Sequence, residues 1–145
     1  MIEAVRPATS ADAAVLAELE ADARAAMADQ RGGSRRLAEE PAVGDWAALV
    51  TLPDRVWVAT IDAVVVGYLE LAVRDDVAEV RQVWVHPEAR EVGLGDGLLE
   101  AAIDGARRIG CTVLEGTALP GDRETKNLYE RAGITARKIV VSTTL

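Results

Sequence analysis

Residues 83–97 read Val83-Trp84-Val85-His86-Pro87-Glu88-Ala89-Arg90-Glu91-Val92-Gly93-Leu94-Gly95-Asp96-Gly97, an apolar strand followed by a glycine-rich stretch. Apolar residues then recur at helical spacing as far as Ile109, and Gly110 is a typical helix stop. A helix N-terminus offers free backbone N–H groups and a positive dipole end, and glycines let an anion approach them closely. Arg90 adds a guanidinium suited to phosphate. The stretch therefore predicts an anion site between a strand and a helix.

Two other interpretations of these glycines stay open at this point. A glycine-rich turn can serve only to let the helix pack closely. A dinucleotide site of the pattern G-x-G-x-x-G would need glycine where Leu98 stands, and the strand ends at Val85, eight residues before Gly93. Glu115 lies about twenty residues further on, where such a site carries its acidic residue. A Walker loop is excluded, because no Gly-Lys-Ser/Thr follows the glycines.

Outward from this stretch, periodicity and turn residues predict the remaining elements. Strands are expected at Ile2–Arg6, Arg55–Ile61, Val64–Val73, Val77–Val85, Cys111–Glu115 and Ile134–Thr143. Helices are expected over 10–29, Asp45–Leu52, the segment ending at Ile109, and Asp122–Ala132, with a loop at Gln30–Glu40 that carries Arg31, Arg35 and Arg36. Two-residue turns at 62–63 and 75–76 predict an antiparallel meander. We expect one α/β domain over residues 1–145, a mixed sheet with helices on both faces.

Composition narrows the classes of function. The 145-residue chain has a net charge of −8, which disfavours nonspecific binding to nucleic acid or an anionic membrane and mildly favours a cationic partner. Aromatic residues make up 3% of the chain, too few for base-stacking platforms, and one Cys with one His cannot build a zinc site. No apolar run approaches the ~18 residues of a membrane span, and no signal peptide is evident. With Cys111 as its single cysteine, the chain is expected to be cytoplasmic.

The pattern Arg90-x-x-Gly93-x-Gly95 after a strand resembles motif A of the GNAT N-acetyltransferase superfamily, Arg/Gln-x-x-Gly-x-Gly/Ala. Residues 127–134, Asn-Leu-Tyr-Glu-Arg-Ala-Gly-Ile, are similar to the closing helix of the family, L-Y-E-x-x-G-F. Both motifs follow the meander in the order that the family has. The resemblance implies a GNAT-like mixed central sheet with an antiparallel meander and a splayed cofactor cleft, here between Val77–Val85 and Cys111–Glu115.

The resemblance also implies acetyl-CoA, or another acyl-CoA, as donor, with no metal. In the family, backbone amides of the glycine-rich loop hold the pyrophosphate, and the strand before it pairs with the pantetheine. An Asn often contacts the cofactor where this chain has Asp122. The cofactor-binding positions carried onto this chain are Val83, Trp84, Val85, Arg90, Glu91, Val92, Gly93, Leu94, Gly95, Asp96, Gly97 and Asp122.

Several residues depart from the family pattern. Glu91 stands where glycine is frequent, Val92 where a basic residue is frequent, and Asp96 where Ser, Arg or Lys is common. The two carboxylates would weaken pyrophosphate binding unless they point to solvent. One strand follows Gly133 where the family usually has two, which motivates the hypothesis of a homodimer whose partner subunit completes the sheet.

Four residues are candidates for catalysis and acceptor binding. Tyr129 matches the family tyrosine that protonates the leaving thiolate. Glu79 is the candidate base, or the residue that orients a base water. A two-residue turn at 75–76 would place Ala72 opposite Glu79, Glu70 opposite Arg81 and Tyr68 opposite Val83. This polar face makes Tyr68 and Glu70 the candidate substrate residues, although a plain Glu70–Arg81 pair in solvent would explain it equally.

Together these residues predict an acyl-CoA-dependent N-acyltransferase that passes acetyl to a small-molecule or peptide amine by direct attack. Two alternatives from other classes remain. A non-catalytic acyl-CoA-binding module would bind the donor without turnover, and a nucleotide-cofactor protein would bind NAD(H) instead. The arginines of the Gln30–Glu40 loop would suit an acidic acceptor, whereas the net charge favours an amine, so the acceptor stays open.

Overall fold

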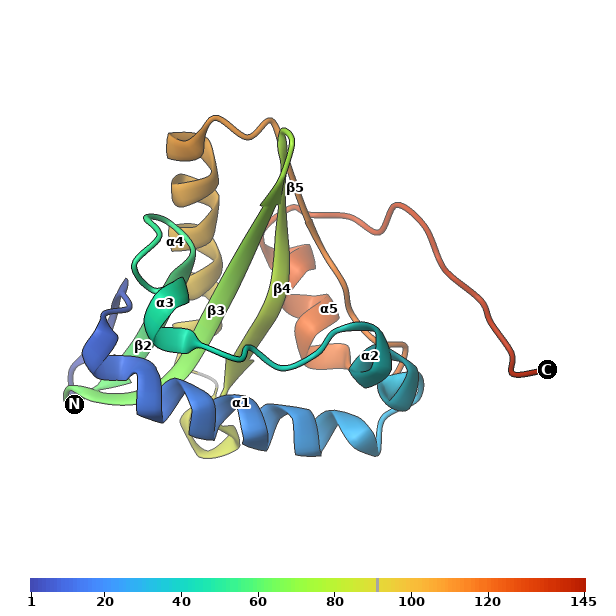
Figure 1. Ribbon diagram of the computed structural model, residues 1–145, viewed down its shortest axis with the longest axis horizontal. Coiled ribbons are helices and arrows are strands. Elements are labelled where there is room, and N and C mark those ends of the chain that lie inside the picture. Colours follow the sequence, from blue (N-terminus) through green and yellow to red (C-terminus); the bar gives the residue numbers. More distant parts are fainter. Residues whose placement is uncertain (91) are drawn as a thin grey trace.

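The computed structural model describes residues 1–90 and 92–145, and Glu91 lies outside them. Five strands form one sheet in the order β1-β2-β3-β4-β5 (Figure 1). The strands are β1 (Glu3–Pro7), β2 (Val56–Ile61), β3 (Val64–Arg74), β4 (Val77–Val85) and β5 (Val113–Gly116). The helices are η1 (Ser10–Asp12), α1 (Ala13–Ala28), α2 (Gly33–Glu39), α3 (Trp46–Leu49), η2 (Pro87–Ala89), α4 (Leu94–Ile109) and α5 (Arg123–Arg131).

The first four strands pair antiparallel, and β5 joins β4 in parallel. The two hairpin turns have left-handed residues, with φ of 49° at Asp62, 67° at Ala63 and 55° at Asp75. Asp tolerates this conformation better than most residues, which favours tight two-residue connections. The predicted mixed α/β sheet with its antiparallel meander is therefore confirmed.

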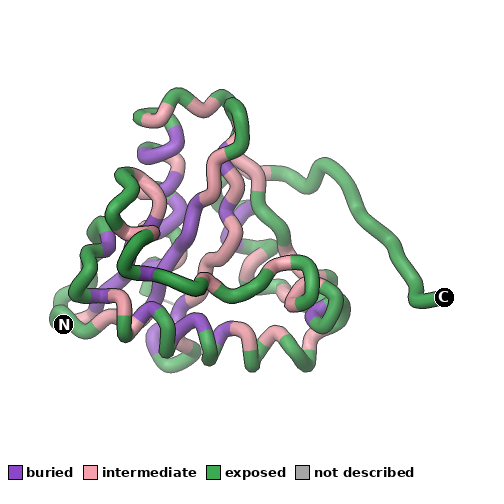
Figure 2. Tube along the Cα trace, in the orientation of Figure 1, coloured by how far each residue is buried: buried purple, intermediate pink, exposed green. Residues whose placement is uncertain are grey.

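Helices cover both faces of the sheet (Figure 1). On one face α4 presents Leu98, Leu99 and Ala102 to the strand residues Leu69 and Leu71. On the other face, α1 and α3 pack their apolar residues around the buried Tyr68 of β3. The purple segments of Figure 2 follow these two layers, and the C-terminal segment from residue 135 is green. The cleft described below therefore lies on a rigid, well-packed scaffold.

The register of the β3–β4 hairpin changes halfway along it. Ala72 pairs with Glu79 as expected, but Leu71 pairs with Val80 and Glu70 with Gln82. Arg81 is thus the extra residue of a β-bulge on β4. The expected pairs Glu70–Arg81 and Tyr68–Val83 were wrong, because a bulge shifts all pairing beyond it by one residue; Tyr68 pairs with Trp84.

Strands β4 and β5 separate after a short ladder. Their pairing runs from Val77 with Val113 to Val80 with Gly116, where β5 ends. Strand β4 continues past the bulge to Val85. The backbone on this side of Gln82–Val85 has no paired strand among the described residues. The splay expected between these two strands is therefore present.

The segment expected to be a loop at Gln30–Glu40 contains a helix, α2. Its last turn is stabilised by Arg24 of α1, whose guanidinium donates to the carbonyl oxygens of Glu40 at 2.7 Å and Leu37 at 3.3 Å. Arg35 also pairs with Glu39 one turn later, at 2.9 Å. Gly32 and Gly33 favoured the prediction of a loop. The i,i+4 pair and the tertiary contact with Arg24 stabilise a helix there instead.

The strand expected at Ile134–Thr143 is absent, since the described residues 134–145 form no helix or strand. Ile139 and Val141 are 88% and 87% exposed, and the segment extends away from the sheet (Figure 1). A strand pattern forms a strand only where a neighbouring edge pairs with it, and the pattern alone does not supply that edge. None of the described helices is both long and apolar enough to cross a membrane.

Candidate active site

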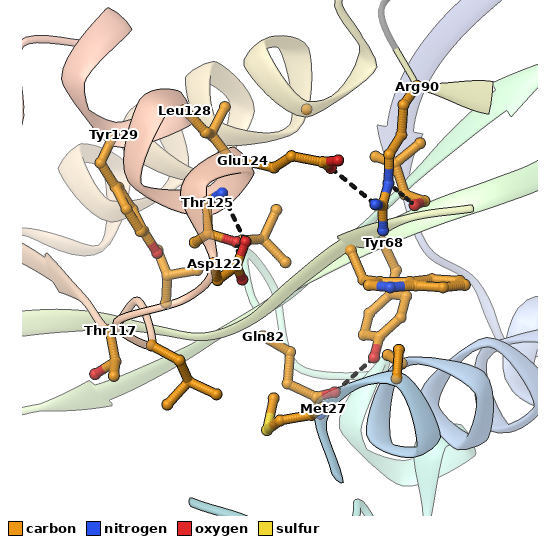
Figure 3. A pocket seen from close by; sticks show the side chains of 18 of the residues that line it. Met27, Tyr68, Gln82, Arg90, Thr117, Asp122, Glu124, Thr125, Leu128 and Tyr129 are labelled. Carbon is orange, nitrogen blue, oxygen red and sulfur yellow. Dashed lines mark hydrogen bonds and ion pairs between the residues drawn. The ribbon is translucent and has the colours of Figure 1, made fainter. Parts of the chain in front are cut away.

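A cleft of about 1220 Å³ opens where β4 and β5 separate. One wall is β4 from Val80 to Val85 with the glycine-rich start of α4, and the other is α5 with the 117–121 loop. Residues of α1 and α2 close one end, where Met27, Tyr68 and Gln82 lie near one another (Figure 3). The cleft therefore brings together segments between Ala23 and Arg131 that are far apart in the sequence.

The start of α4 has the geometry of an anion site. Gly93 is the N-cap with φ of 81°, and the first helical bond runs from the N–H of Gly97 to the carbonyl of Gly93. The N–H groups of the residues between them therefore lack helical acceptors. Among the described residues, and apart from its chain neighbours, no atom lies within 4 Å of a Cβ built at Gly93, and one at Gly95 would only touch Leu128, at 3.6 Å. A phosphate can thus approach these amides, so the residues present fit an acyl-CoA pyrophosphate.

Arg90 is held at the mouth of the cleft by three contacts. Its Nε donates to the carbonyl oxygen of Val85 at 2.8 Å, and its Nη1 lies 2.8 Å from Oε2 of Glu124 (Figure 3). Its guanidinium carbon also lies 5.8 Å from the ring centroid of Trp84. The guanidinium is therefore oriented before any donor arrives.

Two acidic residues of the expected donor site, Asp96 and Asp122, have hydrogen-bond partners within the protein. Asp96 accepts from Nε of Arg131 at 3.0 Å, which offsets its charge at the start of α4. Asp122 is the N-cap of α5 and accepts from the backbone N–H of Thr125 at 3.1 Å and from its hydroxyl at 2.6 Å. Asp122 lines the cleft, but its oxygens are used to begin a helix.

Most expected donor-site residues line the cleft, and some do not. The lining includes Val83, Trp84, Val85, Arg90, Gly93, Leu94, Gly95, Asp96 and Asp122. Val92 is 40% exposed and is not part of the lining. Gly97 faces the sheet, where a Cβ would come within 3.1 Å of Val5, so its small size serves helix packing. Glu91 lies outside the described residues.

Tyr129 of α5 has a buried hydroxyl without a hydrogen-bond partner among the described residues. Its side chain lines the cleft, yet the residue is only 7% exposed. Burial raises the pKa of Tyr129 well above its ordinary value, opposed by Arg36 and supported by Asp122 and Glu79. The hydroxyl therefore keeps its proton at neutral pH and can donate it to a ligand atom in the cleft.

Glu79 lies beside the cleft and outside its lining. Its two carboxylate oxygens are each 4.0 Å from an arginine, Arg36 of α2 and Arg74 of β3. The charge of Glu79 contributes to the raised pKa of Tyr129, which places the two candidate catalytic residues in one electrostatic environment. A role for Glu79 in proton transfer would have to run through a bridging water.

The sequence analysis missed Gln82, which connects a buried polar network. Its amide nitrogen donates to Glu20 at 2.7 Å and to Glu70 at 2.9 Å, and its oxygen accepts from the hydroxyl of Tyr68 at 2.6 Å. Glu20 and Glu70 are 3% and 2% exposed. The two adjacent polar residues Arg81 and Gln82 interrupt the alternation of a strand, and this is the signal that could have revealed the bulge.

Glu70 belongs to a second hollow. It lines a space of about 480 Å³ with Asp45, Leu49 and Arg81, and it is not part of the main cleft. Burial raises the pKa of Glu70, opposed by hydrogen bonds from Gln82 and Arg81. Tyr68 lines the main cleft, and burial raises the pKa of its hydroxyl as well. Of the two expected substrate residues, only Tyr68 therefore borders the space that an acceptor would share with the donor.

The arginines near the acceptor end are engaged by the protein itself. Arg36 lies 3.5 Å from Glu40, and Arg81 lies 3.1 Å from the same carboxylate. Arg81 also pairs with Glu70 at 3.0 Å. Arg36 and Arg81 therefore connect α2 to β4, which leaves them less suited to receive an acidic acceptor. Within residues 1–90 and 92–145, no three His, Cys, Asp or Glu residues cluster as a metal site would need.

Comparison with known proteins decides the family. The model of the acetyltransferase (GNAT) family matches residues 16–134. The chain belongs to the GNAT acetyltransferase family. No curated protein matches the chain.

Solved GNAT structures share the fold across most of the chain. YncA from Salmonella typhimurium, with its cofactor acetyl-CoA, is 26% identical, has a TM-score of 0.72, and aligns over 94% of this chain and 81% of its own. The aminoglycoside N-acetyltransferase AAC(6')-Iy with CoA is 16% identical, has a TM-score of 0.72, and aligns over 98% of each chain. PaiA N-acetyltransferase from Thermoplasma acidophilum with coenzyme A is 17% identical, has a TM-score of 0.71, and aligns over 91% and 89%. These neighbours hold acetyl-CoA or CoA, which is consistent with acetyl-CoA as donor.

Proposed function

We propose that this GNAT domain is an acetyl-CoA-dependent N-acetyltransferase that acts on an amine by direct attack. The observation that supports it most strongly is the buried, unpartnered hydroxyl of Tyr129 beside the cleft. An unsatisfied buried hydroxyl costs stability, about 1–3 kcal/mol. A protein can retain such a hydroxyl where a ligand atom, here the thioester sulfur, accepts its hydrogen bond.

The donor would lie along β4. The unpaired edge of Gln82–Val85 offers main-chain groups to the pantetheine amides, as a neighbouring strand would. The first-turn amides of α4 would hold the pyrophosphate. This arrangement extends the donor from Arg90 at the mouth toward Gly116, where the ladder ends and Tyr129 lies.

The reaction needs one nucleophilic step. The neutral amine nitrogen attacks the thioester carbonyl, a C–N bond forms, and the C–S bond breaks. The leaving sulfur takes a proton from the hydroxyl of Tyr129. The proton that the amine nitrogen loses passes through solvent and reprotonates Tyr129. Glu79 would accept or relay the amine proton through water, since its carboxylate lies outside the cleft lining. The products are the N-acetyl amine and free CoA.

The acceptor end is built from Tyr68, Gln82 and Met27. The side-chain amide of Gln82 already hydrogen-bonds to Glu20, Glu70 and Tyr68. Its role is therefore to shape the cleft wall and the charge distribution behind that wall. The carboxylates behind it favour a cation over an anion. A small amine, an amino acid, an aminoglycoside or a peptide amine are the classes to test.

The experiment is CoA release from acetyl-CoA across such a panel, for wild type and Tyr129→Phe. We expect turnover with at least one amine, and a kcat lower by about tenfold or more in Tyr129→Phe. The affinity for acetyl-CoA should stay within about threefold, because the change removes one oxygen that contacts only the reacting centre. Acetyl-CoA binding without turnover across the panel would favour the non-catalytic binding module instead.

A further inference from the structure

The ion pair between Arg90 and Glu124 joins the two walls of the cleft. Arg90 follows η2 on the β4 wall, and Glu124 lies in the first turn of α5 on the opposite wall. Both side chains line the cleft, and Figure 3 shows the pair meeting across its mouth. Since the β4–β5 ladder ends at Val80 and Gly116, this contact bridges walls that the sheet no longer connects.

Glu124 differs from the other acids at this mouth. Asp96 pairs with Arg131 at 3.0 Å, and Asp122 accepts from Thr125 within its own helix. Glu124 alone among these three acids contacts Arg90, the residue that begins the glycine-rich loop. Its side chain is 68% exposed, whereas that of Arg90 is 29% exposed, so Glu124 can turn to solvent while Arg90 stays fixed.

Arg90 is fixed without Glu124, because the carbonyl of Val85 and the ring of Trp84 hold its other edge and its face. Only the edge that bears Nη1 is occupied by the carboxylate. A phosphate oxygen and a carboxylate oxygen make the same charge-assisted bond to a guanidinium. A donor phosphate at the start of α4 and the carboxylate of Glu124 would therefore compete for one edge of Arg90.

We propose that Glu124 is an internal competitor for the anionic donor: its carboxylate occupies the edge of Arg90 that a phosphate of acyl-CoA takes, and donor binding displaces it. This affinity-determining role rests on the proposed function, because it assumes a donor with a pyrophosphate. The exchange replaces one ion pair with another, and no bond is formed or broken. Glu124 thus lowers the affinity for the donor while its ion pair with Arg90 connects the two walls of the cleft.

The test is calorimetric titration with CoA at about 20 mM and 200 mM salt for wild type, Glu124→Gln and Glu130→Gln. Glu130 is the matched control, because it lies on the same helix and pairs with none of the described basic residues. Glu124→Gln should bind CoA about three- to tenfold more tightly at low salt, with a smaller gain at high salt. Glu130→Gln should stay within about twofold of wild type.

An Arg90→Gln background separates a contact with Arg90 from a general charge effect. The gain from Glu124→Gln should largely disappear there, because the edge under competition is gone. An equal gain in that background, or unchanged or weaker CoA binding by Glu124→Gln alone, would overturn the proposal. If CoA bound to no variant at all, the proposed function would fail and this inference with it; binding by wild type without the gain would refute the inference alone.

Discussion

The hydroxyl of Tyr129 lies directly over the Cα of Gly116, where a Cβ would overlap both the oxygen and the ring carbon that bears it. Gly116 is also the last residue of β5 and the partner of Val80 in the final pair of the β4–β5 ladder. Because Gly116 has no side chain, the hydroxyl of Tyr129 can reach the point where β4 and β5 separate. Glycine is required here for space, and not for a left-handed conformation.

Gly116→Ala should displace the Tyr129 ring and lower kcat by about tenfold or more, with acetyl-CoA affinity within about threefold of wild type. Gly44→Ala is the matched control, because Gly44 lies outside the main cleft and no atom of the described residues lies within 4 Å of a Cβ built there. With fluorotyrosine incorporated, NMR reads the two tyrosines separately, and the Tyr129 signal alone should shift in Gly116→Ala. Full activity in that variant would show that the hydroxyl position does not matter.

Gln82→Leu should destabilise the protein by about 3–5 kcal/mol in urea unfolding at pH 7. The change removes three hydrogen bonds and leaves the carboxylates of Glu20 and Glu70 without the amide that bridges them. Gln30→Leu is the control, at a partly exposed residue whose side chain has no hydrogen bond among the described residues. A loss below about 1 kcal/mol in Gln82→Leu would mean that water replaces the amide at no cost.

Asp12 should contribute stability at neutral pH that disappears in acid. Its carboxylate accepts from both terminal nitrogens of Arg6, at 2.8 and 2.9 Å, and from the backbone N–H of Thr9 at 2.8 Å. The hydrogen bond from Arg6 is the main cause that lowers the pKa of Asp12 in the folded protein. A lowered folded-state pKa means stability that is present above the unfolded value, about 3.9, and lost as pH falls through the folded value.

Asp12→Asn should therefore reduce the free energy of unfolding by about 1–3 kcal/mol at pH 7. The gap to wild type should narrow steadily in urea titrations below about pH 4, because the wild-type carboxylate is then protonated first in the unfolded state and, at still lower pH, in the folded state. A gap of constant size down to about pH 2 would contradict the ionic origin of the effect.

Gly105→Ala should destabilise α4 although alanine is the better helix former. A Cβ at this residue would come within 2.7 Å of Cη2 of Trp57 and 3.3 Å of the side chain of Asp54. Trp57 is 2% exposed and cannot move aside freely, so we expect a loss of about 1–3 kcal/mol in thermal or urea unfolding. Gly44→Ala, whose Cβ would meet no atom of residues 1–90 or 92–145 within 4 Å, should leave the stability nearly unchanged.

The sequence predicted the order of strands and helices well where local patterns decide it. The turns at Asp62 and Asp75 and the alternation of β3 fixed the meander, and the glycine-rich stretch marked the start of α4. The helix α2 was not predicted because Arg24, 16 residues before Glu40 in the chain, stabilises its end. The segment 134–143 has a strand pattern without a partner strand, and pairing is not a local property.

The candidate site was predictable only to the level of its motifs. Arg90, Gly95 and Tyr129 meet at one cleft, as the motif order implied. The roles of Gln82 and Glu124 depend on which side chains face each other across a bulge and a cleft. These tertiary contacts cannot be read from the local pattern of a single sequence. The bulge at Arg81 also changed the pairing partner of Glu70, and Glu70 lines the second hollow instead of the main cleft.

The most direct test of the donor site is calorimetric titration of acetyl-CoA into wild type and Gly95→Trp, with CoA and NADH as comparison ligands. Gly95 lines the cleft at the start of α4, so an indole there would fill the space for the pyrophosphate, and Gly44→Trp outside the main cleft is the control. We expect micromolar acetyl-CoA binding by wild type and Gly44→Trp, a loss of at least about a hundredfold in Gly95→Trp, and no comparable binding of NADH. Acetyl-CoA binding that survives in Gly95→Trp, or no binding by wild type at millimolar concentration, would contradict a donor site in this cleft.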